Sequence, residues 1–167
     1  EVTRAAENIK GFEVQFNTRF LKNFDFGISY QRFEGKVDGN DDGDASDEED
    51  VYINTRRINP SILRAKLGYS LNNKFNINLS TVFSGSRDRF EPNEAGAYAY
   101  GEGPVESFNY SNLFASYTYS KNIKFQLGVI NVFNQDFYFT RSQWASRGNT
   151  YEKANGARFN LSAQIRL

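Results

Sequence analysis

Alternation of apolar and polar side chains over seven stretches is the feature of this sequence that most restricts its fold. In the first stretch Phe12 and Phe16 fall on one face, and Glu13 and Gln15 fall on the other. Because successive side chains of a strand point to opposite sides, each stretch is predicted to be a β-strand with one apolar and one polar face. The stretches are residues 12–20, 24–31, 63–71, 75–84, 112–119, 124–129 and 158–167.

The amino-acid composition also favours strands over helices. Aromatic residues make up 16% of the chain, with 16 Phe and 10 Tyr, and Met and Cys are absent. Aromatic residues are enriched in strands, whereas helical bundles favour Leu, Ala, Glu and Lys. No apolar run approaches the roughly 20 residues that a membrane-spanning helix needs. The sequence therefore predicts an all-β, antiparallel protein.

The lengths of the stretches and of their connections point to a transmembrane β-barrel. Most stretches have about 9–11 residues, which is the length of a tilted strand that crosses a bilayer. Short turns alternate with long loops at Phe33–Pro60, Gly85–Tyr110 and Asn134–Ala157, as in outer-membrane proteins with short periplasmic turns and long extracellular loops. The apolar face is then expected to meet lipid. The alternative is a soluble β-sheet binding protein, whose apolar face would turn inward.

The number of strands predicts that the barrel has further strands outside this sequence. Bacterial single-chain barrels have an even number of antiparallel strands. In a bilayer, each unpaired backbone group at an open edge costs several kcal/mol. We therefore expect residues 1–167 to be one domain, a part of a larger barrel.

Short motifs resemble the family of TonB-dependent outer-membrane receptors. They are Asn131-Val132-Phe133-Asn134 followed by Asp136, Phe137 and Tyr138, Lys10-Gly11-Phe12-Glu13, and Asn59-Pro60. In their order and spacing they are similar to strand starts and ends in that family. The resemblance implies that residues 1–167 are the C-terminal part of such a barrel, about the last seven of its roughly 22 strands.

The resemblance further implies energised import of a scarce ligand, such as a chelated metal, a vitamin, a glycan or a peptide. The implied location is the bacterial outer membrane, with the long loops extracellular and lipid around the barrel. Implied partners are the rest of the barrel, a plug domain and the TonB complex, which would contact a segment upstream of this sequence. A surface lipoprotein partner is left open, as is the alternative of a small adhesin or structural barrel.

Two properties of the composition argue against other classes of function. The chain has no His, which removes the usual general base of barrel lipases and proteases, so no enzymatic activity is expected. Lysine and arginine balance aspartate and glutamate, so the net charge is zero and no nucleic-acid partner is expected.

An acidic stretch in the first long loop fits a calcium-binding pattern. From Glu34 to Asp50 there are nine acidic residues and one Lys, a net charge of −8. Residues 38–49 match the twelve-residue loop D-x-[DN]-x-[DN]-G-x5-E, although strands rather than helices flank it. The alternative is a solvated acidic loop, since such matches arise easily in acidic sequence. The candidate Ca²⁺ ligands are Asp38, Asn40, Asp42, Asp44 and Glu49.

Three aromatic residues of the other long loops are candidates for contact with an imported ligand. Tyr98, Tyr100 and Trp144 lie in stretches predicted to be loops, where their rings could stack on a ligand. The alternative is that they pack against neighbouring loops.

Overall fold

The computed structural model describes residues 5–145 and 152–166, and it is almost entirely β-structure. A single short helix, α1, covers Thr140–Ala145 of the described residues. The strands are β1 (Glu7–Phe20), β2 (Phe24–Val37), β3 (Val51–Tyr52), β4 (Ile62–Leu71), β5 (Phe75–Ser84), β6 (Phe108–Thr118), β7 (Ile123–Ile130) and β8 (Arg158–Ile165).

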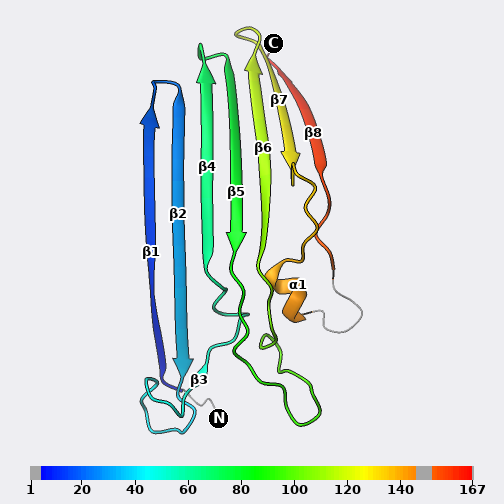
Figure 1. The fold of residues 1–167 in the computed structure, drawn as a ribbon. Helices are drawn as coiled ribbons and strands as arrows, with labels where there is room; N and C mark the ends of the chain where they lie inside the picture. Colours follow the sequence, from blue (N-terminus) through cyan, green and yellow to red (C-terminus); the bar gives the residue numbers. More distant parts are fainter. Residues whose placement is uncertain (1–4, 146–151, 167) are drawn as a thin grey trace.

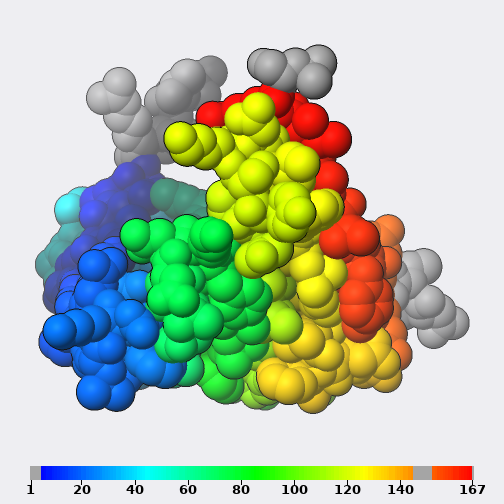
Figure 2. Space-filling model, turned by 90° about the horizontal axis from the view of Figure 1, so that it is seen from above, coloured from blue at the N-terminus to red at the C-terminus, as the bar shows by residue number. Residues whose placement is uncertain are grey.

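The strands form one antiparallel sheet whose order follows the chain. β1, β2, β4, β5, β6, β7 and β8 are neighbours in that order, and β3 pairs only with β2. The short turns lie at one end of the sheet and the long loops with α1 at the other (Figure 1). Seen along the strands, the sheet is curved (Figure 2). Within the described residues β1 and β8 do not pair with each other, so the sheet is an open segment of a barrel.

The structure confirms the seven predicted strands and adds elements that the sequence did not predict. β2 continues to Val37 instead of ending near residue 31, and β3 pairs with its last residues, Lys36 with Tyr52 and Val37 with Val51. The predicted loop Phe33–Pro60 is therefore wrong for both segments. The apolar alternation stops at Arg32, although the backbone hydrogen bonds continue. The pattern ends because a strand outside the hydrocarbon layer need not keep an apolar face. α1 was also unpredicted.

The apolar face of the sheet is exposed rather than packed in a core. Phe16 is 55% exposed, Leu67 44% and Leu161 78%. The buried apolar side chains lie chiefly in the loops, Ile53, Val105 and Trp144 among them. A soluble sandwich would bury the apolar face of its strands, so this arrangement contradicts the soluble alternative. No helix among the described residues is long and apolar enough to cross a membrane.

Consecutive residues in the left-handed backbone region make two of the short turns. Asn72 and Asn73 have φ of 50° and 54°, and Leu21 and Lys22 have 48° and 60°. Positive φ values at adjacent turn residues suit the right-handed twist of a tight hairpin, and Asn adopts them at little cost. Together with Ser120–Asn122, these turns confirm the predicted alternation of short and long connections.

Candidate functional site

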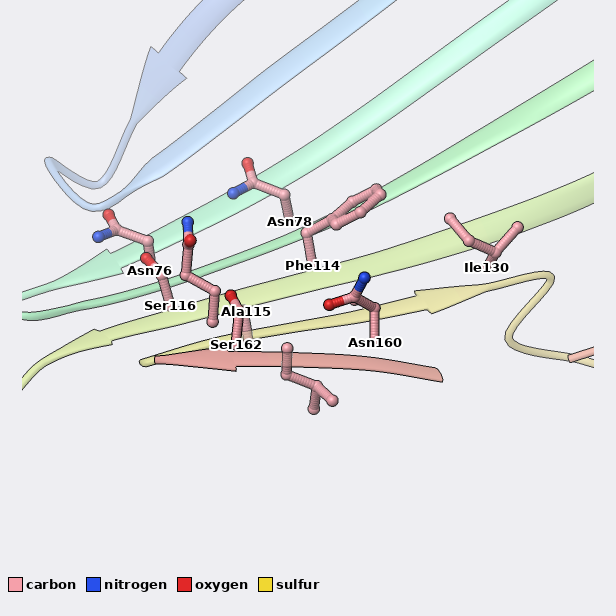
Figure 3. A pocket seen from close by; sticks show the side chains of 11 residues that line it. Asn76, Asn78, Phe114, Ala115, Ser116, Ile130, Asn160 and Ser162 are labelled. Atoms are coloured by element: carbon pink, nitrogen blue, oxygen red, sulfur yellow. The ribbon is translucent and has the colours of Figure 1, made fainter. Parts of the chain in front are cut away.

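The polar face of the sheet is lined mainly by amides and hydroxyls where β5, β6, β7 and β8 lie side by side. A cavity of about 480 Å³ is lined by residues of β5, β6, β7 and β8. A cavity shared by four neighbouring strands of a curved sheet lies on its concave side, which is the lumen side of a barrel. Asn76, Asn78 and Asn160 are among the side chains that line it (Figure 3). These groups donate and accept hydrogen bonds, as expected for a wall that faces water or a plug. Elsewhere the same face carries charge, for example at Arg64 and Lys66 of β4, which pair with Ser29 and Gly27 of β2.

A buried arginine ties together the two long loops that follow β2 and β5. Arg87 is 7% exposed and donates to the backbone oxygens of Ile58 and Asn59. Its backbone pairs with Val105, at 2.8 Å and 2.7 Å. Burial, and secondarily the charge of nearby Arg89, lower the pKa of Arg87 to about 10, so the guanidinium is still charged at neutral pH.

The helix α1 is fixed to the start of β6 by one buried amide. Gln143, 7% exposed, accepts a hydrogen bond from the backbone N–H of Glu106 at 2.6 Å. Its amide nitrogen donates to the backbone oxygens of Glu106 and Tyr138. A short helix contributes little stability by itself, so these contacts define where α1 lies in the loop end.

Asn131, the first residue of the motif at the end of β7, fastens the last long loop. It is 2% exposed and adopts φ of 51°. Its amide nitrogen donates to the backbone oxygens of Gln135 and Asn155, and its amide oxygen accepts from the N–H of Gln135. The motif noted in the sequence is therefore structural: an Asn here satisfies backbone groups on both sides of the loop.

Two of the three candidate ligand-contacting aromatics meet in the loops. The rings of Tyr100 and Trp144 are 5.0 Å apart and edge-on at 89°. Trp144 is 7% exposed and Tyr100 56%. The guanidinium of Arg56 lies 5.7 Å from the Tyr100 ring. Tyr98 is half-buried in the same loop as Tyr100. Trp144 therefore supports Tyr100 from behind, and Tyr100 presents the accessible ring.

A larger aromatic cluster, which the sequence did not single out, lies nearby. Phe108 and Tyr110 of β6 each stack on Phe137, with ring centroids 5.1 Å and 5.2 Å apart. Phe139 stands edge-on to Phe137 at 5.0 Å. By their alternation, Phe108 and Tyr110 share the lumen face with Phe114, which lines the cavity described above. The spacing of Phe108 and Tyr110, two residues apart on one strand, could have predicted that these two rings share a face. Phe137 and Phe139 lie in a loop, so no strand pattern predicts their contact with β6.

The acidic loop is folded around the side chain of its first residue. The Asp38 carboxylate accepts backbone N–H groups from Asn40, Asp41 and Gly43, at 3.2, 2.7 and 2.8 Å. These donors lower the pKa of Asp38, and the N–H of Gly43 has the largest effect. Gly43 has φ of 89°, which glycine adopts readily. The loop thus turns as the calcium pattern requires at its sixth position.

The other candidate calcium ligands also come close to one another. The Asn40 side-chain nitrogen donates to Asp42 Oδ2 and to Glu49 Oε2, both at 3.1 Å. The Asp44 N–H donates to Asp42 Oδ1 at 2.7 Å. In residues 5–145 and 152–166, however, no group of three or more His, Cys, Asp or Glu side chains is arranged to hold a metal ion. Calcium binding by this loop remains a prediction.

The fold is similar to that of solved transporters and receptors. The copper transporter OprC has 18% sequence identity and a TM-score of 0.71, over 98% of this chain and 24% of that one. The ferripyoverdine receptor of the outer membrane of Pseudomonas aeruginosa has 13% identity and a TM-score of 0.69, over 96% of this chain and 20% of that one. For the siderophore receptor PiuA from Acinetobacter baumannii the values are 13%, 0.63, 96% and 22%.

The chain therefore spans about a quarter or less of the length of these structures. A family model described as "TonB dependent receptor-like, beta-barrel" matches residues 2–132, which is most of the sequence. With the open antiparallel sheet, the exposed apolar face and the alternation of short turns and long loops, this match places the chain in the family of TonB-dependent receptor β-barrels.

Proposed function

We propose that this chain forms part of the wall of an outer-membrane transporter that imports a scarce ligand with energy delivered through TonB. The observation that carries the proposal is the division of one curved sheet into an exposed apolar face and a polar face with a shared cavity. Such a wall separates lipid from a water-filled or plugged lumen. The rest of the barrel, a plug and a TonB-contacting segment are the partners that this function requires.

The loop end offers the ligand an aromatic surface. Tyr100 is the exposed ring, and Trp144 and Arg56 hold it in place. A ring that is already ordered binds a planar ligand at a lower entropic cost than a free one. We propose Tyr100 as the contact, with Tyr98 and Trp144 shaping its surroundings. The similar structures suggest copper and iron–siderophore complexes as the first ligands to examine.

The acidic loop is proposed as a calcium site that orders the loop end. Asp42 and Glu49 direct carboxylate oxygens toward the same amide group of Asn40. Rotation of that amide would place its oxygen where its nitrogen now donates, so that three oxygens would face one ion. Oxygen ligands of this kind suit Ca²⁺.

The transport proposal is tested by uptake in cells that lack their own receptors. The whole receptor is expressed, and the entry of radiolabelled ferripyoverdine and of copper is measured with and without a protonophore. We expect uptake of one probe that the protonophore abolishes. Tyr100→Ala should weaken binding of that probe about 2- to 10-fold, since an aromatic pair contributes about 0.5–1.5 kcal/mol.

Tyr119→Ala is the matched control, because Tyr119 is 63% exposed but lies at the short-turn end. Uptake that is insensitive to the protonophore would contradict energised transport. An equal loss in both variants would contradict the role of Tyr100 while leaving the transport proposal standing.

A further inference from the structure

The lipid-side face of β1 and β2 changes from aromatic to charged at one level near the loop end. Phe12 and Tyr30 lie on this face, with ring centroids 5.7 Å apart. Side chains two residues apart on a strand share a face, so Lys10 of β1 and Arg32 of β2 continue it. The register places Phe12 opposite Arg32 and Lys10 opposite Glu34. The same rows therefore pass from rings to cations in one step.

The height of this step matches the lipid headgroups. A strand rises about 3.3 Å per residue, so Lys10 lies about 7 Å along the strand from Phe12. At a tilt of about 45° this is about 5 Å along the membrane normal. The headgroup layer on each side of the hydrocarbon is roughly 5–8 Å thick. If Phe12 and Tyr30 mark the edge of the hydrocarbon, Lys10 and Arg32 lie among the headgroups.

Further cations join the same face from above. The Arg89 guanidinium lies 4.4 Å from the Tyr52 ring, and the Lys36 ammonium lies 5.5 Å from that ring. Tyr52 pairs with Lys36 in the sheet. Arg89 thus reaches over from the loop after β5 to β2 and β3.

One carboxylate, that of Glu34, forms ion pairs with two of these cations. Glu34 Oε1 is 2.8 Å from Arg32 Nη2 and 3.4 Å from Arg89 Nη2. We call Lys10, Arg32, Lys36 and Arg89 the cationic patch. With Glu34 included it keeps a net charge of +3, and a bound anion would relieve the repulsion among its members.

A cavity of about 200 Å³ opens on this patch. Its lining includes the cations Lys10 and Lys36, the carboxylate of Glu34, and Asn8 and Tyr52, and the acidic loop contributes only Ala45 and Ser46. The wall that the acidic loop turns toward the cavity is therefore uncharged. Asp47 meets Lys36 through its backbone oxygen rather than its carboxylate. Glu34, the one carboxylate in the lining, is paired with Arg32, which stands beside the cavity. The cations that remain around the cavity are suited to a phosphate group.

We propose that the cationic patch binds the phosphorylated headgroup of a lipid in the leaflet that surrounds the loop end. The phosphate would lie against Lys10 and Arg32, and the acyl chains would run down β1 over Phe12, Val14 and Phe16, which are 52%, 59% and 55% exposed. The site combines a charged upper part with an apolar lower part, which a lipid matches and a soluble anion does not. The proposal rests on the barrel fold and is independent of which ligand is imported.

The test is a titration of the whole receptor in detergent with a bis-phosphorylated lipid A, followed by native mass spectrometry. Parallel arms use the same lipid after removal of its phosphates, and inorganic phosphate alone. We expect tight retention of the phosphorylated lipid only. The double variant Lys10→Gln/Arg32→Gln should weaken it about 25-fold, about fivefold for each cation removed. Lys121→Gln, an exposed cation in the turn between β6 and β7, should have no effect.

Equal retention by the double variant and by Lys121→Gln would overturn the proposal. Equal binding of the dephosphorylated lipid would also overturn it, and saturable binding of inorganic phosphate would replace it with a site for free anions. If the double variant does not assemble, the salt dependence of the unaltered receptor decides. Retention of the phosphorylated lipid should fall as salt rises, and unchanged retention would refute the proposal.

Discussion

Two polar residues, Asn131 and Arg87, determine how the long loops sit on the sheet. Asn131 stood out in the sequence because of its motif, whereas Arg87 resembled any loop arginine. The difference is physical. The partners of Asn131 include a residue only four positions away, Gln135, but those of Arg87 are carbonyls 28 and 29 residues away. A role that depends on distant backbone groups leaves no local pattern.

The calcium proposal is tested at the level of single carboxylates. Glu49→Gln should weaken calcium binding to the assembled receptor about tenfold or more, because the bidentate carboxylate is lost. Binding by the unaltered loop is expected at roughly 10⁻⁴–10⁻³ M, as in extracellular calcium modules. Calorimetry measures the affinity, and protection of residues 38–50 from proteolysis reports the ordering of the loop.

Glu48→Gln provides a matched control for this experiment. Glu48 lies in the same loop and is exposed, and its replacement removes the same charge without removing a predicted ligand. Comparable weakening in both variants would indicate a diffuse attraction of cations by a solvated acidic loop. Absence of saturable binding by the unaltered receptor would lead to the same conclusion.

Strands that cross the membrane and continue beyond it carry two kinds of pattern. In β2 the apolar alternation marks the part in the hydrocarbon, and the charged residues from Arg32 onward mark the part above it. The hydrogen-bonded register with β1 continues through both parts, up to the pair of Glu7 with Val37. Hydrophobic periodicity therefore locates the bilayer more reliably than it locates the ends of strands.

Cysteine substitution tests which side of each strand meets lipid. Phe16→Cys and Leu67→Cys should react with a lipid-soluble thiol reagent, and Gln15→Cys and Asn78→Cys with a water-soluble one. The reason is the alternation of side chains along a strand: the first two residues lie on the apolar face of the sheet, and the other two lie on the polar face. Residues 1–167 contain no Cys, so no side chain of this segment other than the introduced one can be labelled. The labelled fraction is measured by mass spectrometry in the assembled receptor.

Neighbouring residues on one strand, Gln15 and Phe16, serve as each other's controls in this experiment. Labelling of both by the same reagent would contradict the assignment of faces, and with it the barrel wall proposed above.

The whole sheet was largely predictable from the sequence, and the loop end was not. Seven strands and six connections follow from one repeated pattern, because each strand of a barrel has one lipid face and one lumen face. The contact of Tyr100 with Trp144 joins loops 44 residues apart, and the stacking of Phe108 on Phe137 joins a strand to a loop. Such contacts depend on how the loops fold over each other, which alternation does not encode.

The open edges of the sheet predict how residues 1–167 behave when they are produced alone. β1 has 14 residues and β8 has 8, so closure would leave part of β1 unpaired. Each neighbouring pair along the main path is antiparallel, so the seventh strand of that path runs parallel to the first. A direct pairing of β8 with β1 would then be parallel, unlike every other pair.

Unpaired backbone groups cost several kcal/mol each in an apolar environment. We therefore expect these residues in detergent to form oligomers or aggregates, whereas the whole receptor gives a protease-resistant monomer whose gel mobility changes on heating. A heat-modifiable, protease-resistant monomer of residues 1–167 alone would show that the segment closes by itself.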